Sequence, residues 1–177
     1  MAKLIILEGI ERCGKTTLIE ILHRDNIGTF VKPGKKQPDD IPFEHLGIFY
    51  EGIHNFTQKF LKIIPNDTYI FDRFFLSEFV YSEQFKRKTY MDIEYVKELS
   101  KDNEITMFYL KNTHRDYLNR GPKNKVKLTS TEYTDMQYLF ASHIFEIQHQ
   151  VPKINIEVID TSVNDLKTVY NIIKDKI

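Results

Sequence analysis

The stretch that decides the fold is Gly9-Ile10-Glu11-Arg12-Cys13-Gly14-Lys15-Thr16, which matches the phosphate-binding pattern G-x-x-x-x-G-K-[ST]. In this pattern the glycines let the backbone curl, so that successive N–H groups point inward at phosphate oxygens. The lysine places a positive charge on the β- and γ-phosphates, and the hydroxyl that follows it can ligate Mg²⁺. The sequence therefore predicts that ATP and Mg²⁺ bind here. The predicted contacts are Gly9, Glu11, Cys13, Gly14, Lys15, Thr16 and Thr17.

The regions on either side of this loop alternate between strand and helix patterns. A continuous apolar run at 3–7 predicts a buried strand, and leucine and isoleucine at helical spacing predict a helix over 15–24. Such alternation predicts a parallel sheet of five strands with helices on both faces, which is an α/β P-loop NTPase fold in one domain, 1–177. The other expected strands are 29–31, 68–71, 105–110 and 154–159, and the other expected helices are 43–64, 74–86, 91–100, 130–149 and 163–175.

Composition limits the cellular compartment and the classes of partner that are expected for this protein. The 25 basic and 25 acidic side chains cancel, whereas proteins that bind nucleic acid usually carry a basic surplus. Cys13 is the only cysteine, so no intrachain disulfide can form and a reducing compartment is expected. No apolar run reaches membrane-spanning length, and the first one leads into the phosphate loop instead of a cleavage site. These features predict a cytoplasmic protein with no nucleic-acid or membrane partner.

Ligands of such folds bind at the carboxyl ends of the strands, where a second chemical motif lies. Asp72 would end a strand beside the first one, so its carboxylate could reach the Mg²⁺ or its water shell. Arg73, Ser77 and Tyr81 are spaced by four residues, which predicts one helix face carrying a guanidinium, a hydroxyl and a phenol toward an acceptor. The alternative is an Asp–Arg pair that only caps the helix. The complete set of predicted rim positions is Gly9, Pro33, Asp72, Lys111 and Asp160.

These two motifs resemble those of the thymidylate kinase family of nucleoside monophosphate kinases. The stretch from Leu7 to Thr17 is similar to that family's F-E-G-[IV]-D-[RG]-A-G-K-S-T, and Asp72 to Tyr81 matches the spacing of its D-R-x-x-x-S-x-x-x-Y-Q. Lys32-Pro33-Gly34 falls where the family has R-E-P-G, and Asn112 to Arg120 falls where the family runs from its fourth strand into a lid arginine. The similarity is thin but spans most of the chain, and it also implies a homodimer.

The resemblance implies roles for residues around ATP and its acceptor. The sequence departs from the family's pattern at three positions. Glu11 is one methylene longer than the usual aspartate, Ser82 takes the place of a base-contacting glutamine, and Glu51 takes the place of a base-reading arginine. All three departures concern the acceptor, so the donor chemistry is better supported than a thymidylate acceptor. The implied roles are Lys15 and Thr16 for ATP·Mg²⁺, Glu11 for the acceptor sugar, Arg12 as a phosphate-loop arginine, Asp72 and Arg73 for metal and phosphate, and Arg120 as the lid arginine.

A basic segment follows the fourth expected strand. Residues 111–127 contain six lysines and arginines but one acidic residue, Asp116. A cationic lid over 114–128 would exclude water and offset charge on a transferring phosphoryl group, and Arg120 is its best single candidate. The alternative is a solvated loop.

The predicted function is ATP-dependent phosphorylation of a small nucleotide, most simply a (deoxy)nucleoside monophosphate. One alternative is a deoxynucleoside kinase in which Glu8 acts as base on the sugar hydroxyl, although Glu8 could equally be a hydrogen-bonded carboxylate at a strand end. Another is a P-loop module that binds a nucleotide without catalysis. Arg12, Arg73 and Arg120 come from three separate segments, and we expect them to converge on the phosphoryl group in flight.

Overall fold

The computed structural model describes residues 1–31, 46–65, 67–89, 91–120 and 127–177. Five strands in this part of the chain form one parallel sheet in the order β2-β3-β1-β4-β5. The phosphate motif follows the central strand β1, so it emerges between β3 and β4. The strands are β1 Ala2–Glu8, β2 Thr29–Val31, β3 Thr68–Asp72, β4 Asn103–Lys111 and β5 Asn155–Asp160.

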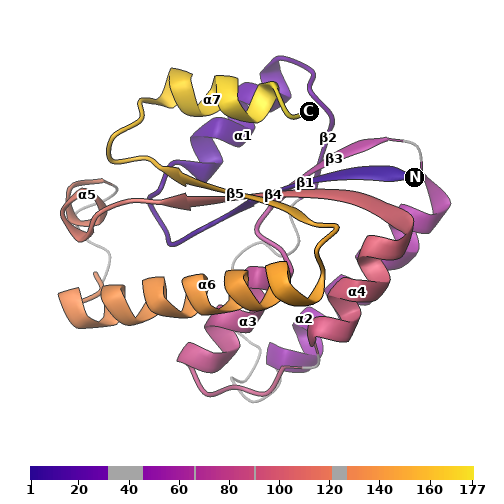
Figure 1. Ribbon diagram of the computed structural model, residues 1–177, viewed down its shortest axis with the longest axis horizontal. Coiled ribbons are helices and arrows are strands. Elements are labelled where there is room, and N and C mark those ends of the chain that lie inside the picture. The colour runs from indigo at the N-terminus through magenta and orange to yellow at the C-terminus, as the bar shows by residue number, and fades with distance from the viewer. Residues whose placement is uncertain (32–45, 66, 90, 121–126) are drawn as a thin grey trace.

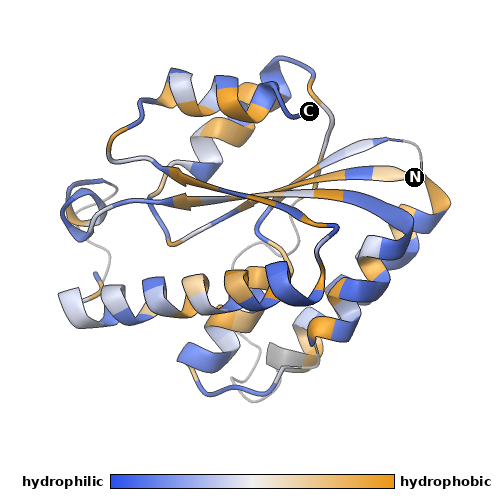
Figure 2. Cartoon of the chain, in the orientation of Figure 1, coloured by the Kyte–Doolittle hydropathy of each residue, from blue (hydrophilic) through white to orange (hydrophobic). Residues whose placement is uncertain are grey.

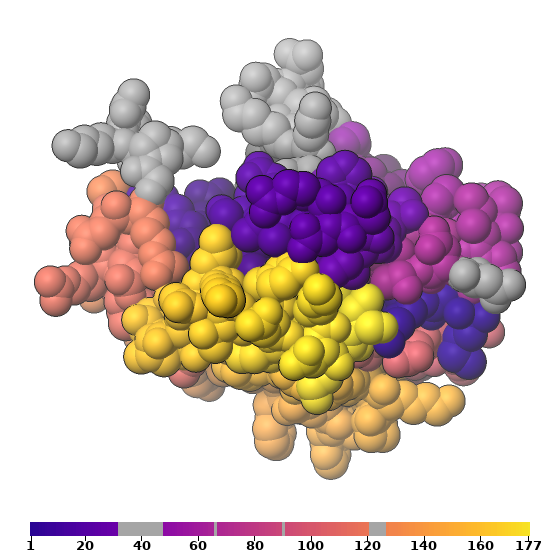
Figure 3. Space-filling model, turned by 90° about the horizontal axis from the view of Figure 1, so that it is seen from above, coloured from indigo at the N-terminus to yellow at the C-terminus, as the bar shows by residue number. Residues whose placement is uncertain are grey.

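Helices cover both faces of this sheet. In Figure 1, α1 and α7 lie on one face, and α2, α3, α4 and α6 lie on the other. Figure 3 looks onto the first face and shows α1 and α7 side by side above the sheet. The helices are α1 Lys15–Arg24, α2 Leu46–Ile63, α3 Phe75–Gln84, α4 Ile93–Asp102, α5 His114–Asn119, α6 Ser130–Gln150 and α7 Leu166–Lys174.

The sheet is hydrophobic on both faces because helices bury both (Figure 2). Along β1 the side chains alternate: Leu4 and Ile6 join the core beneath α3, α4 and α6, while Ile5 and Leu7 join the core beneath α1 and α7. A central strand buried on both sides leaves little room for movement. The loop that leaves its carboxyl end therefore starts from a fixed point.

The expected fold class is confirmed, and the expected strands all form within two residues of their predicted ends. The helix expected from 43 is described from Leu46, and it ends at Ile63 just before Pro65. Pro33 and the neighbouring Lys32 and Gly34 lie outside the described residues. No helix in the described ranges is long and apolar enough to cross a membrane.

The first residues of the basic segment form helix α5, His114–Asn119, which was not among the expected helices because they carry few apolar side chains. The function of the segment as a lid stays a prediction. Thr113 caps this helix by accepting a hydrogen bond from the Asp116 N–H at 3.1 Å, and that local signal was present in the sequence. The sequence therefore held more information about this segment than its charge alone. Residues 121–126, the middle of the expected lid, lie outside the described residues.

Candidate active site

The phosphate loop runs from β1 into α1 and surrounds the ammonium group of Lys15. The Nζ atom of Lys15 donates to the carbonyl oxygens of Gly9 at 2.7 Å and Ile10 at 2.8 Å, and it lies 3.2 Å from the Cys13 Sγ. Burial lowers the pKa of Lys15, and the positive charge of Arg73 lowers it further. A charge held inside a loop, beside a second cation, is placed to interact with a polyanion.

The backbone of this loop needs its glycines. Gly9 has φ 136°, and a Cβ there would lie 2.2 Å from the backbone oxygen of Leu110 on β4. Gly14 has φ 94° and precedes α1, whose first turn has no side-chain cap. The N–H groups at the start of α1 are therefore not used by a capping side chain, which suits an anion. Arg12 also has a positive φ, 66°, which is rare for a side chain of its size.

Cys13, which the sequence predicts as an ATP contact, has a buried side chain. Its side chain is only 1% exposed, because it packs into the core beneath α1 with Leu18 and Leu22. The protein itself already covers the thiol. Contact between this residue and a nucleotide would have to come from its backbone.

Asp72 and Arg73 lie next to the phosphate loop, as the parallel pairing of β3 with β1 requires. Asp72 is opposite Leu7 in the sheet and is buried, and its charge acts on Lys15. Arg73 follows the strand with φ 69°, so it lies outside α3 and not on the helix face that the four-residue spacing predicted. Its guanidinium nevertheless reaches that helix, because Nη1 donates to the Tyr81 hydroxyl at 2.5 Å and Cζ lies 5.1 Å from the centre of the Tyr81 ring.

Tyr81 holds Arg73 at the edge of the phosphate loop. Burial raises the pKa of Tyr81, against the opposing effect of Arg73, while the charges of Glu11 and Glu8 raise it further. The side chain of Glu11 is exposed, and its contact with an acceptor sugar stays a prediction.

Glu8 and Ser77 contact each other. The carboxylate of Glu8 accepts hydrogen bonds from the backbone N–H groups of Phe74 at 2.7 Å and Ser77 at 3.3 Å, and from the Ser77 hydroxyl. Glu8 is 0% exposed, and burial raises its pKa against these hydrogen bonds. The Ser77 hydroxyl is thus engaged within the protein, and a role in substrate binding stays a prediction.

Arg12 leaves the loop on the opposite side from Arg73. Its Nη1 donates to the backbone oxygen of Tyr117 in α5 at 3.1 Å, and its Cζ lies 4.8 Å from the centre of the Tyr117 ring. Its Nη2 is buried and has no hydrogen-bond partner among the described residues. A buried guanidinium nitrogen without a partner fits an anion at this place, because it would otherwise be desolvated with no compensation.

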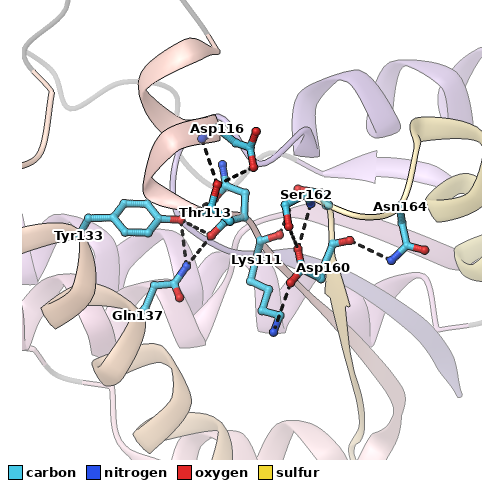
Figure 4. Close-up of polar contacts among 10 residues, drawn as sticks. Lys111, Thr113, Asp116, Tyr133, Gln137, Asp160, Ser162 and Asn164 are labelled. Carbon is cyan, nitrogen blue, oxygen red and sulfur yellow. Dashed lines mark hydrogen bonds and ion pairs between the residues drawn. The ribbon is translucent and has the colours of Figure 1, made fainter. Parts of the chain in front are cut away.

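Arg120 is held at the rim formed by β4 and β5. Its guanidinium donates to the hydroxyl of Thr161 at 3.2 Å and to the backbone oxygen of Thr161 at 2.9 Å. Figure 4 shows the polar cluster around this rim, in which Lys111 pairs with Asp160 at 3.4 Å. Arg12, Arg73 and Arg120 therefore each contact a different element, and their convergence on one phosphoryl group stays a prediction.

The same rim is connected to α6. The Tyr133 hydroxyl donates to the backbone oxygen of Asn112 at 2.5 Å, and the Gln137 amide donates to that oxygen at 2.9 Å. Figure 4 labels Tyr133 and Gln137. The side-chain amide of Asn112 in turn reaches the backbone oxygen of Arg12 at 3.5 Å. A buried network thus joins the end of β4 to the phosphate loop.

A buried ion pair lies on another face of α3 and was not predicted from the sequence. Arg87 donates to the two carboxylate oxygens of Glu78 at 2.5 and 2.6 Å, and both side chains are 5% exposed. Arg87 also lies over the ring of Tyr50, at 5.1 Å. Nothing in the spacing of these residues indicates the pair, because they are separated by a turn.

His54 on α2 lies close to this ion pair. Its ring centre is 5.1 Å from that of Phe74, and it is 4% exposed, with no partner for Nδ1 among the described residues. Burial, and then the charge of Arg87, lower the pKa of His54 from 6.5 to about 4. His54 is therefore neutral at physiological pH.

The arrangement suits a bound polyphosphate better than a metal held by protein alone. The described ranges contain no group of three or more His, Cys, Asp or Glu side chains that could hold a metal ion. Thr16 is exposed at the start of α1, and Asp72 ends the neighbouring strand. Two such oxygen ligands suit Mg²⁺ that is shared with phosphates and water.

Several solved structures share this fold. The YorR protein of Bacillus subtilis, in complex with phosphorylated GDP, matches with a TM-score of 0.73 and 17% identity, covering 98% of this chain and 95% of that one. Thymidylate kinase of Candida albicans matches with a TM-score of 0.69 and 15% identity, covering 99% and 91%. Deoxyadenosine kinase of M. mycoides with bound dATP matches with a TM-score of 0.64 and 15% identity, covering 98% of both chains.

Comparison by sequence adds nothing to this result, since no family model and no curated protein matches the chain. The chain has the α/β P-loop fold that is also found in a thymidylate kinase and a deoxyadenosine kinase. Because the identities are low, the likeness concerns the fold.

Proposed function

We propose that the protein is a nucleotide kinase that transfers the γ-phosphoryl group of ATP to a small nucleotide, most simply a (deoxy)nucleoside monophosphate. The observation that carries this proposal is the position of Arg73, whose N–H donates to the backbone oxygen of Leu7 at 3.0 Å, at the end of the strand that leads into the phosphate loop. Its guanidinium is held there by the Tyr81 hydroxyl. A protein that only binds ATP has no need of a second fixed cation on the side away from α5. A kinase needs one for the phosphate of the acceptor and for the phosphoryl group in transfer.

In this proposal, different residues bind different parts of the two substrates. Lys15 and the loop N–H groups bind the β- and γ-phosphates, and Thr16 and Asp72 would hold Mg²⁺ with those phosphates. An acceptor phosphate oxygen forms a bond to the γ-phosphorus while the bond to the β,γ-bridging oxygen breaks, and ADP leaves. Arg73 would bind the acceptor phosphate, Arg12 would offer Nη2, which has no partner among the described residues, to the donor phosphates, and Arg120 would leave Thr161 to reach the donor side.

The deoxynucleoside kinase is the second candidate, and the deoxyadenosine kinase among the structural neighbours keeps it open. It would require Glu8 to remove a proton from the acceptor hydroxyl. The carboxylate of Glu8 is fully buried and already accepts three hydrogen bonds from Phe74 and Ser77. This arrangement favours the monophosphate acceptor, which needs no such base.

The test is ADP formation from ATP·Mg²⁺ with a panel of nucleosides and nucleoside monophosphates. We expect turnover with at least one monophosphate and none with the matching nucleoside. Turnover with nucleosides alone would favour the second candidate. Nucleotide binding without turnover of any acceptor would favour a binding module, and would contradict the proposal.

Lys15→Ala provides the control for this assay. It should lower kcat by on the order of 10³ or more, about 4 kcal/mol of barrier, and should keep the thermal transition within a few degrees. Lys97→Ala removes a partly exposed lysine that pairs with Glu94 on α4, far along the chain from the loop, and should leave kcat unchanged. Full activity in folded Lys15→Ala would refute the assignment of the phosphate loop.

A further inference from the structure

We infer that Glu8 is a positioning residue that holds Arg73 in place by capping α3 from the neighbouring strand. This inference rests on the proposed function only in that it assigns Arg73 to the reaction. Glu8 ends β1 directly before the phosphate loop, and α3 begins two residues after Arg73. The contact thus joins the loop motif to the second motif, more than sixty residues later in the chain.

Helix α3 lacks a cap of its own. Its N-cap residue is Phe74, which has no side-chain oxygen, with φ −156° and ψ −132°. The N-caps of the other helices with a side-chain cap are aspartate or threonine, as at Asp92 and Asp165. Glu8, at the end of β1, supplies the missing cap, since its Oε1 accepts hydrogen bonds from the N–H groups of Phe74 and Ser77. A carboxylate at the N-terminus of a helix also interacts favourably with the helix dipole.

The backbone at Arg73 needs this support. Its φ of 69° lies in the left-handed region, which is unfavourable for a side chain of this size. The N–H of Arg73 donates to the backbone oxygen of Leu7 at 3.0 Å, and the N–H of Phe74 donates to Glu8. Two successive residues are thus bonded to two successive residues of β1. These bonds fix the direction in which the Arg73 side chain leaves the backbone.

The same carboxylate also balances charge. Burial lowers the pKa of Arg73, but Tyr81 and then Glu8 raise it above its usual value. Burial raises the pKa of Glu8, and Arg73 is one of the groups that oppose this effect. The Ser77 hydroxyl donates to the second carboxylate oxygen. The serine that the motif spacing placed toward a substrate therefore serves to hold Glu8.

A positioning residue and a general base respond differently to the same substitutions. In Glu8→Gln the side-chain oxygen can still accept from Phe74 and Ser77, and the Ser77 hydroxyl can turn to accept from the amide. A glutamine cannot act as a base. We therefore expect Glu8→Gln to lower kcat by about three-fold or less, and Glu8→Ala to lower it by about 10²-fold through misplaced Arg73. A base would lose about 10²- to 10⁴-fold in both variants.

Asp165→Ala is the matched control for loss of a cap. Asp165 accepts from the Thr168 N–H at 2.7 Å at the start of α7, away from Arg73. Glu8→Ala and Asp165→Ala should each lower the thermal transition by about 2 to 4 °C. Only Glu8→Ala should lower kcat. An equal loss of kcat in both variants would show that loss of a helix cap is sufficient, and would overturn the inference.

The decisive measurement is whether Glu8 acts through Arg73. In an Arg73→Ala background, Glu8→Ala should lower kcat by less than two-fold more, because the group that it positions is gone. Independent effects that multiply would overturn the inference. If the wild-type protein phosphorylates no acceptor, the proposed function fails, but a ¹⁵N-arginine NMR spectrum still tests this inference. The side-chain signal of Arg73 should move in Glu8→Ala and stay near its wild-type position in Glu8→Gln, and no movement in Glu8→Ala would contradict it.

Discussion

The two sides of the phosphate loop hold their arginines in different ways. On the side of α3, Arg73 has its backbone bonded to Leu7 and its guanidinium bonded to a tyrosine hydroxyl. On the side of α5, Arg12 and Arg120 donate to the backbone oxygens of Tyr117 and Thr161. The first arrangement orients a cation before any substrate arrives, whereas in the second Arg120 must exchange its Thr161 partners for a phosphate.

This difference bears on catalysis because groups that are already in place stabilise a transition state without further reorganisation. A group that has to leave a hydrogen bond contributes only the excess of its new interaction over the old one. We therefore expect the α3 side to dominate the rate and the α5 side to contribute less.

Arg73→Ala should have the largest effect on the reaction. A single well-placed arginine contributes on the order of 10³ to 10⁵ in rate, about 4 to 7 kcal/mol, so kcat should fall by that factor while ATP affinity changes only a few-fold. Arg73→Lys should rescue poorly, since an ammonium lacks the planar fork. Single-turnover kinetics at saturating substrates measure this. A wild-type rate in Arg73→Ala would remove the distinction between the two sides.

Arg87→Ala should show how much the buried ion pair with Glu78 on α3 contributes to the stability of the protein. It leaves the buried carboxylate of Glu78 without its partner, which should lower the free energy of unfolding by about 3 to 5 kcal/mol. Urea denaturation measures the change. The control is Lys97→Ala, which breaks an exposed pair with Glu94 and should have little effect. A similarly small effect of Arg87→Ala would show that the buried pair does not stabilise this region.

His54 should make the α3 side sensitive to acid. The pKa of His54 is about 4 in the folded protein and 6.5 in the unfolded chain. Between these two pH values the unfolded chain binds a proton that the folded protein does not, so the free energy of unfolding is highest above pH 6.5 and decreases as the pH falls toward 4. The loss should reach about 3 kcal/mol. In His54→Phe this contribution is absent, so the free energy of unfolding should decrease less between pH 6.5 and 4 than in the wild type. Urea denaturation at each pH measures the difference. His149→Phe, at an exposed histidine on α6, is the control, and equal acid loss in wild type and His54→Phe would contradict the prediction.

Arg120→Ala should have the smallest effect of the four. Because Arg120 must leave Thr161, its net contribution should be about ten-fold in kcat, or about 1.4 kcal/mol. The same single-turnover assay as for Arg73→Ala measures it, and the ratio of the two losses gives the comparison directly. A loss as large as that of Arg73→Ala would show that the α5 side is equally important.

The parts of this protein that the sequence determined are those that depend on neighbours in the chain. The phosphate loop could be recognised because Gly9, Gly14 and Lys15 act within a single turn of backbone. The strands could be placed because burial on both faces produces continuous apolar runs such as Leu4 to Leu7. The position of Asp72 beside the loop followed from the parallel order of the strands, since carboxyl ends meet at one edge of the sheet.

Tertiary structure decided which groups satisfy one another. Glu8 caps a helix that begins far away in the chain, Arg12 lies on Tyr117, and Arg120 is held by Thr161. The four-residue spacing placed Arg73 on a helix face, but its positive φ puts it before the helix. A local pattern reports the periodicity of a segment, whereas the partner of a buried polar group depends on which elements the sheet brings together. That is why the sequence identified the chemical groups of this site, and only the packed structure showed which of them are held in place.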